Sequence, residues 1–160
     1  MKVFSLRFDP EHEPRCALSP ESVKKLTGLG LEVLTGPGVG DPSHYPDDAL
    51  VAAGAKLVED REAALAEADV IAAIDRPTPE VIAKLKRGAW FLGMLDPFHR
   101  RDLIEAFAAA GVNAVSLEMI PRTTIAQKMD VISSQANLAG YAGVIEAASV
   151  SRKLLPMMMT

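Results

Sequence analysis

The sequence of 160 residues lacks the features that mark several large classes of protein. Its single cysteine, Cys16, excludes an internal disulfide framework and a cysteine-rich zinc site, and a chain without disulfides is typical of the cytoplasm. With 17 Lys and Arg against 21 Asp and Glu, the chain has no basic excess of the kind that nucleic-acid binders carry. Its apolar runs fall far short of the ~20 residues that span a bilayer. We therefore expect no nucleic-acid partner and no membrane-spanning segment.

Several local motifs are also missing. The three histidines, His12, His44 and His99, lack the spacing of metal ligands, so we expect no metal. Neither the serine-hydrolase elbow nor a phosphate-binding loop with its lysine occurs. The glycine-rich stretch Gly36–Gly40 follows an expected strand, but residues 41–43 do not begin a helix. Without a helix N-terminus to hold a pyrophosphate, we interpret this stretch as a surface loop.

What is present is an apolar chain, 49% hydrophobic with a net charge of −4, which indicates a folded domain. Short apolar runs alternate with amphipathic stretches that often end at glycine. The expected strands cover residues 2–8, 31–35, 55–58, 69–74, 89–95 and 113–117, and the expected helices cover residues 19–29, 47–53, 61–68, 79–86 and 101–110. Such a pattern predicts an α/β fold, flavodoxin-like or Rossmann-like, with a parallel sheet of about six strands covered by helices on both faces.

After residue 129 the pattern changes to one long helical run, residues 130–150. Small residues spaced four, three and four apart leave one face of this run nearly bare, which predicts close packing on the domain's own sheet or on a sister domain. These residues are Ala136, Gly140, Gly143 and Ala147. The apolar tail, residues 154–160, has no further element to pack on. We therefore expect an α/β domain of residues 1–129, and a linker helix and tail of residues 130–160.

The densest polar segment is residues 118–134, which begins where the last expected strand ends. Ligand sites in parallel sheets lie beyond the carboxyl ends of the strands. Arg122 offers a fork of N–H donors and Gln127 a matched donor and acceptor, which suit an amide or a carboxylate. Asp130 and Ser133 share one face of the helix start, where Asp130 could hold Arg122 by a charge-assisted pair. On chemistry alone, an equal alternative is that Asp130 only caps the helix beside a solvated loop.

Two longer motifs stand out: P-R-x4-Q-x-M-D-x2-S-S-x2-N-x-A-G-Y at residues 121–141, and E-P-R-C-A-L-S-P at residues 13–20. The first resembles a segment of the proton-translocating NAD(P) transhydrogenase alpha subunits and their relatives, the alanine dehydrogenases, and the second is similar to that family's opening E-x-R-V-A-L-T-P. The resemblance extends along essentially the whole chain. Shorter matches lie at residues 53–55, 68–70, 77–80 and 156–160. Each match alone is weak, but the set is specific. The resemblance implies the N-terminal domain of a transhydrogenase alpha subunit.

Two positions separate the branches of this family. The alanine dehydrogenases have a lysine and a histidine that bind and protonate the keto acid, where this sequence has Asp75 and Asp96. Since neither aspartate can donate as those residues do, the resemblance favours the transhydrogenase branch, and we interpret Arg15 as structural. An alanine dehydrogenase-like enzyme and a non-catalytic flavodoxin-like interaction module are the alternatives.

The resemblance also implies a site. The implied cofactor-binding residues are Arg122, Thr123, Thr124, Gln127, Asp130 and Ser133, of which Gln127 and Asp130 are expected to be catalytic. Arg122 and Ser133 would hold the carboxamide of NAD(H), Asp130 would orient Arg122, and Gln127 would reach toward NADP(H) on a partner subunit. Direct hydride transfer requires positioning but no acid or base, which suits a segment without histidine.

The same resemblance implies partners and a location. The expected partners are the NADP-binding and membrane-spanning transhydrogenase subunits and a second copy in a homodimer. Through these subunits the protein would lie in the cytoplasm at the periphery of the inner membrane. The family's NAD-binding Rossmann domain would follow residue 160 and is absent from this sequence, so we expect this chain alone to bind NADH weakly or not at all.

Overall fold

The structure is a computed structural model that describes residues 1–152. The apolar tail and the motif match at residues 156–160 therefore lie outside the described residues. The chain forms two compact units, of which the first is Met1–Leu117 and the second begins at Glu118. The polar segment with the predicted site belongs to the second unit. A domain boundary at residue 129 stays a prediction.

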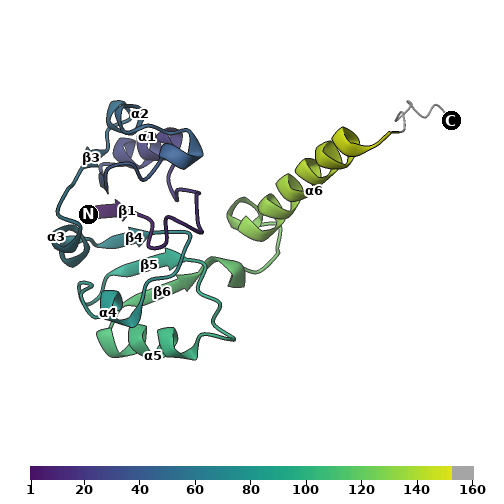
Figure 1. Ribbon diagram of the computed structural model, residues 1–160. Helices are drawn as coiled ribbons and strands as arrows, with labels where there is room; N and C mark the ends of the chain where they lie inside the picture. Colours follow the sequence, from purple (N-terminus) through teal and green to yellow (C-terminus); the bar gives the residue numbers. More distant parts are fainter. Residues whose placement is uncertain (153–160) are drawn as a thin grey trace. The chain divides into compact units, whose positions relative to one another are not determined.

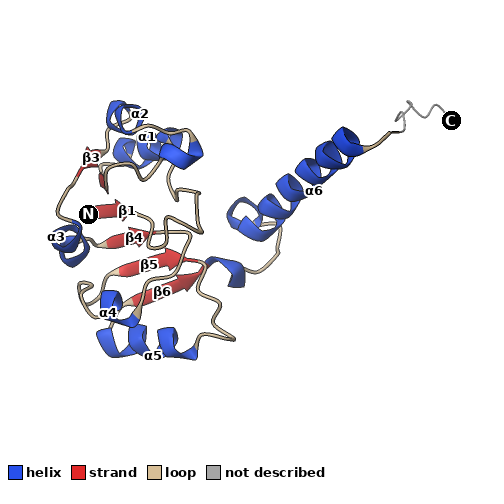
Figure 2. Ribbon diagram, in the orientation of Figure 1, coloured by secondary structure: helices blue, strands red, loops and turns tan. Residues whose placement is uncertain are grey.

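Six parallel strands form the sheet of the first unit in the order β3-β2-β1-β4-β5-β6 (Figures 1 and 2). The strands are β1 (Lys2–Ser5), β2 (Glu32–Thr35), β3 (Lys56–Leu57), β4 (Val70–Ala72), β5 (Trp90–Gly93) and β6 (Asn113–Ser116). They confirm the predicted α/β class and the parallel sheet. The order reverses between β1 and β4, and ligands of such doubly wound sheets usually bind beyond the carboxyl ends of the strands at this reversal.

The α-helices of the first unit lie within about one residue of the predicted bounds, except α4. They are α1 (Pro20–Gly28), α2 (Asp47–Ala52), α3 (Arg61–Glu67), α4 (Pro79–Ile82) and α5 (Arg101–Ala110), and a short 3-10 helix, η1, covers Asp41–Ser43. Ser19 caps α1 by accepting a hydrogen bond from the Ser22 amide at 3.2 Å. Gly111 ends α5 with a φ of 67°, a conformation that glycine adopts without strain.

One predicted helix is too long. We expected residues 79–86, but α4 ends at Ile82. The amides of Lys84 and Leu85 donate to the carbonyls three residues back, those of Val81 and Ile82, at 3.0 and 3.1 Å. These bonds tighten the chain into turns and end the α-helical pattern early.

The main core lies on one face of the sheet. A single row of apolar side chains crosses four neighbouring strands, because the register places four residues opposite one another. They are Leu34, Phe4, Ile71 and Phe91. This row packs against α3, α4 and α5. The Phe91 and Phe107 rings, for example, have centroids 5.3 Å apart.

The opposite face is only partly covered. Val33 of β2 packs with Val23, Leu50 and Ala55 from α1, α2 and the segment after α2. Trp90 of β5 points away from the main core, because side chains alternate along a strand, and it is 50% exposed. Helices therefore lie on both faces of the sheet, as predicted, and the face that carries Trp90 is the less covered one at β5.

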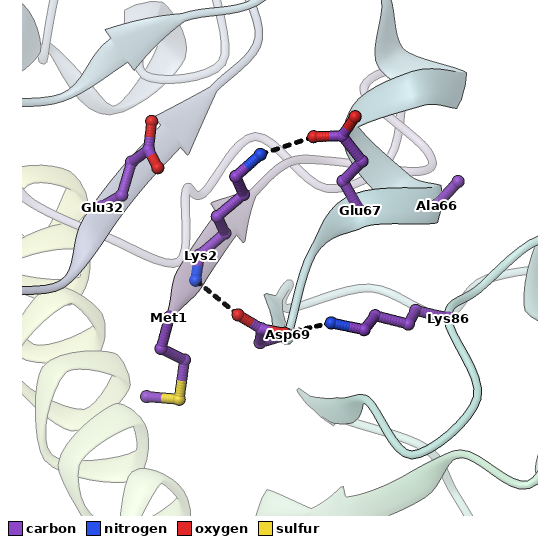
Figure 3. Close-up of a pocket in the computed structure, with 7 residues that line it drawn as sticks. All are labelled: Met1, Lys2, Glu32, Ala66, Glu67, Asp69 and Lys86. Atoms are coloured by element: carbon purple, nitrogen blue, oxygen red, sulfur yellow. Dashed lines mark hydrogen bonds and ion pairs between the residues drawn. The ribbon is translucent and has the colours of Figure 1, made fainter.

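The amino ends of the strands carry a network of ion pairs (Figure 3). Asp69 accepts a hydrogen bond from the Lys2 amide at 2.8 Å and pairs with Lys86 Nζ at 2.5 Å. Lys2 Nζ in turn pairs with Glu67 at 2.5 Å. These groups line an open hollow of about 530 Å3. Since they bind one another, we interpret the network as a connection between β1, β4 and α3.

Up to residue 152, the second unit contains two short 3-10 helices and one long helix. The 3-10 helices are η2 (Leu117–Met119), which begins at the last residue of the first unit, and η3 (Gln127–Met129); the long helix is α6 (Val131–Val150). Residues 133–150 are all exposed. A Cβ atom added at Gly140 or Gly143 would meet no described atom within 4 Å, so close packing of the small-residue stripe stays a prediction. None of the helices in residues 1–152 has the length and apolar character needed to cross a membrane.

Candidate functional site

The segment between η2 and η3 is held by a series of tight turns. The Thr123 amide donates to the Pro121 carbonyl at 2.9 Å, and the Ala126 amide donates to the Thr123 carbonyl at 3.1 Å. Thr123 Oγ1 also accepts from the Ala126 amide at 3.4 Å. The Met129 amide then donates to the Ala126 carbonyl at 2.8 Å. The Thr123 hydroxyl is therefore used within the loop, while Thr124 is exposed.

Asp130 caps α6. Its Oδ1 accepts a hydrogen bond from the Ser133 amide at 2.9 Å, and its carbonyl accepts one from Ser134 Oγ at 2.9 Å. The hydrogen bonds from Ser133, and to a smaller degree the positive charge of Arg122, hold the pKa of Asp130 below its ordinary value. Asp130 is thus a fixed anion at neutral pH, suited to orienting a cation and not to transferring a proton.

Arg122 and Gln127 present their polar groups to solvent. Both residues are exposed. Among the described residues no ion pair joins Arg122 to Asp130, although the charge of Arg122 acts on the pKa of Asp130. The structure does not show the charge-assisted pair considered above, and Asp130 Oδ1 accepts from the Ser133 amide.

The polar side chains of Arg122 and Gln127 are suited to binding a polar ligand. A guanidinium and a primary amide can together recognise an amide or a carboxylate through several directed hydrogen bonds. The residues from 121 to 133 include no cysteine and no histidine, and their only carboxylate is held as a helix cap. The segment is therefore suited to binding and orienting a ligand, and it has no acid, base or nucleophile poised for bond cleavage.

The two aspartates that separate the family branches both accept hydrogen bonds. Asp75 Oδ2 accepts from the amides of Phe8, at 2.5 Å, and Asp9, so it joins the loop after β1 to the loop after β4. Asp96, in a left-handed conformation with a φ of 51°, accepts from His99 Nδ1 at 2.7 Å and from Arg76 Nη1 at 3.3 Å. The His99 bond in particular lowers the pKa of Asp96. Both carboxylates therefore act as hydrogen-bond acceptors in these contacts.

The contacts of these two aspartates are not among the sequence predictions. Asp96 and His99 are three residues apart, and Pro97 between them favours a turn. This spacing could have predicted their pairing. The bonds from Asp75 to the loop after β1 connect residues 66 and 67 positions apart, and no local pattern indicates them.

Arg15 has a structural partner. Its Nε and Nη2 donate to the two carboxylate oxygens of Glu13 at 2.7 and 2.6 Å. This bidentate pair lowers the pKa of Glu13. The geometry is consistent with the structural interpretation of Arg15. Within residues 1–152, no group of three or more His, Cys, Asp or Glu side chains gathers as metal ligands would.

Comparison with known proteins identifies related sequences. Residues 9–139 match the family described as "Alanine dehydrogenase/PNT, N-terminal domain". An NAD(P) transhydrogenase subunit alpha protein of Rhodospirillum rubrum is 42% identical over 153 residues, which cover 92% of this chain and 40% of that protein. The alanine dehydrogenase of Halomonas elongata is 26% identical over 159 residues, 91% of this chain and 43% of that enzyme. The chain thus spans about two fifths of the length of these relatives.

Solved structures agree with the sequence comparison. The crystal structure of transhydrogenase from Sinorhizobium meliloti superimposes with a TM-score of 0.89 at 42% identity and covers 100% of this chain and 48% of that chain. An L-alanine dehydrogenase superimposes with a TM-score of 0.69 at 23% identity over 75% of this chain and 33% of that chain, which shows a shared fold alone. Both the TM-score and the sequence identity are higher for the transhydrogenase than for the alanine dehydrogenase.

Proposed function

Because the chain belongs to the family of alanine dehydrogenase and PNT N-terminal domains, we propose that it contributes to the NAD(H)-binding component of an NAD(P) transhydrogenase. The complete enzyme would transfer hydride from NADH to NADP+. The observation that carries the proposal is the 42% identity to a transhydrogenase alpha subunit over 92% of the chain, against 26% for an alanine dehydrogenase. Asp75 and Asp96 support the same branch, since both carboxylates accept hydrogen bonds at the positions where alanine dehydrogenases have a lysine and a histidine.

The residues from 122 to 133 would contact the nicotinamide end of NAD(H). The exposed Arg122 guanidinium, together with Ser133, fits the carboxamide, and Thr123 and Thr124 flank this contact. Asp130 would act by position, since it fixes the start of α6 and its negative charge attracts Arg122. Gln127, whose side chain is exposed, would reach toward the NADP(H) of a partner subunit. When bound, NAD(H) supplies the hydride.

Hydride transfer requires little of this chain beyond orienting the bound cofactor. Hydride transfer between two nicotinamide rings requires reacting atoms about 3–3.5 Å apart and aligned, and holding them there supplies much of the rate enhancement. A segment whose carboxylate serves as a helix cap, and whose turns are joined by the bonds of Thr123 and Asp130, is suited to this task. Proton translocation would be the work of other subunits.

The proposal includes an assembly. The transhydrogenase relatives are named as subunits, which implies that those proteins work with further subunits. We propose an NADP-binding subunit, a membrane-spanning subunit and a second copy of this chain as partners. The chain would then lie on the cytoplasmic side of the inner membrane, at its periphery.

A segment exchange tests the proposal. The matching segment of the Rhodospirillum rubrum alpha subunit is replaced by residues 1–152, and hydride transfer from NADH to NADP+ is measured in the reconstituted complex. We expect transfer within about tenfold of the parent rate. The control exchange uses the matching segment of the Halomonas elongata alanine dehydrogenase, which we expect to be inactive. A chimera of this chain that assembles and binds NADH but transfers no hydride would contradict the proposal.

A further inference from the structure

A second pocket lies in the first unit at the carboxyl ends of β1 and β2. It has a volume of about 280 Å3. We call it the Arg7 pocket; its walls include Leu6, Arg7, Gly36, Val39, Val58 and Arg61. Arg7 follows β1, and Gly36 begins the glycine-rich stretch for which the sequence predicts a surface loop. None of these residues belongs to the proposed nicotinamide contacts.

Arg7 has unused hydrogen-bond donors. Its Nη2 donates to the Gly38 carbonyl at 3.0 Å. Its Nε and Nη1 are buried and have no hydrogen-bond partner among the described residues. A buried charged donor without an acceptor is costly, so an acceptor that reaches this guanidinium gains a strong, charge-assisted bond.

The charges around the pocket favour a single negative charge. Arg7 and Arg61 contribute two positive charges, and Glu59 contributes one negative charge. The Arg61 guanidinium lies over the Phe8 ring, 5.1 Å from its centroid. Glu13 also faces Arg7, and its pKa is lowered first by its hydrogen bond to Arg15 and to a smaller degree by the charge of Arg7. Because both carboxylate oxygens of Glu13 bond to Arg15, they leave the Arg7 donors unpaired.

The location supports a binding role. The pocket lies at the carboxyl ends of the parallel strands, where ligands of such sheets usually bind, and its lining comes from β1 and from the segments after β1, β2 and β3. The hollow at the amino ends of the strands differs, because Lys2, Glu67, Asp69 and Lys86 bind one another there (Figure 3). At the carboxyl ends, the Arg7 donors lack such partners among the described residues.

We propose that the Arg7 pocket binds a small organic monocarboxylate. The carboxylate would bind Arg7, and a short apolar group would lie against Val39 and Val58. A monoanion fits better than phosphate, because the Glu59 carboxylate repels a second negative charge and part of the wall is aliphatic. The size of the pocket limits the ligand to a few carbon atoms.

Nuclear magnetic resonance of the 160-residue chain tests this proposal, with isobutyrate and inorganic phosphate as the probes. We expect isobutyrate to shift the Arg7 Nε–H resonance and the amides of Gly36 and Val58 saturably. R7M should weaken isobutyrate binding by about tenfold or more, since it removes a charge-assisted bond. R101M is the matched control, because Arg101 is 89% exposed on α5, and it should bind as the parent does.

V58F keeps the test decisive if R7M does not fold. This variant fills the pocket and leaves Arg7 intact, and it should also lose isobutyrate binding. The proposal is overturned if isobutyrate produces no saturable shift, if R7M or V58F binds it like the parent chain, or if phosphate binds at Arg7 more tightly than isobutyrate.

Discussion

The first unit and α6 use apolar residues in opposite ways. In the first unit, Phe4, Ile71 and Phe91 are completely buried and pack against helices of the same unit. In α6, Tyr141 and Val144 are 70% and 64% exposed, although the helix is rich in apolar residues. The first unit therefore contains the interactions that stabilise its own fold, whereas α6 displays surface that is suited to a partner.

Truncating one apolar side chain in each region should give the largest contrast. F91A removes a fully buried ring that contacts Phe8 and Phe107, and we expect it to lower the free energy of unfolding by about 3–5 kcal/mol. L138A, at a 58% exposed position of α6, should change it by less than about 0.5 kcal/mol. Urea unfolding of the 160-residue chain measures both. Equal losses would mean that α6 stabilises the fold as much as the sheet does.

Replacing one glycine by alanine in each region should change the stability by smaller amounts, and the two changes should have opposite signs. In G40A the new Cβ would lie 2.2 Å from the Tyr45 carbonyl oxygen, so we expect a loss of about 1–3 kcal/mol. In G140A the Cβ would meet nothing within 4 Å, and the higher helix propensity of alanine should stabilise α6 by up to about 1 kcal/mol. Thermal unfolding monitored by circular dichroism measures the stability of both variants against the parent chain. Destabilisation by G140A would indicate that another backbone packs closely on the stripe.

The smallest change in stability should come from protonating Asp69 at acidic pH. Hydrogen bonds from Lys86 and from the Lys2 amide lower the pKa of Asp69 below its ordinary value of 3.8. A depressed pKa means that this stabilisation is complete above the ordinary value and is lost as the pH falls through the lower, folded-state pKa. D69N should therefore destabilise the chain at pH 7 and have little effect near pH 2. Urea midpoints at both pH values measure this; an equal effect at both would exclude the ion pair as the cause.

The fold was largely predictable because its signals are local. Apolar runs mark all six strands, and caps such as Ser19 and Gly111 mark helix ends. The prediction was wrong for the end of α4, which turn-type bonds at Lys84 and Leu85 shorten, and it did not indicate that Trp90 is half exposed. Hydrophobic periodicity predicts which side chains share a face but not what covers that face.

The candidate site was predictable to a different degree. The capping role of Asp130 follows from its place before a helix, and the hydrogen bond from the Ser133 amide shows that role. Whether Arg122 and Gln127 bind a nicotinamide stays a prediction, since the structure gives their exposure and no ligand contact. The Arg7 pocket could not be predicted, because Arg7 and Arg61 are 54 positions apart and only the fold brings them to one pocket.

The most direct test of the proposed function is single-turnover hydride transfer from NADH to NADP+ in a complete transhydrogenase that carries this chain. With both R122A and Q127A, we expect the rate to fall by about 100-fold or more, because orientation of the rings is lost. K128A, at an exposed position of the same 3-10 helix as Gln127, should leave the rate unchanged. A parent-like rate in the double variant would contradict the assignment of this segment to the nicotinamide.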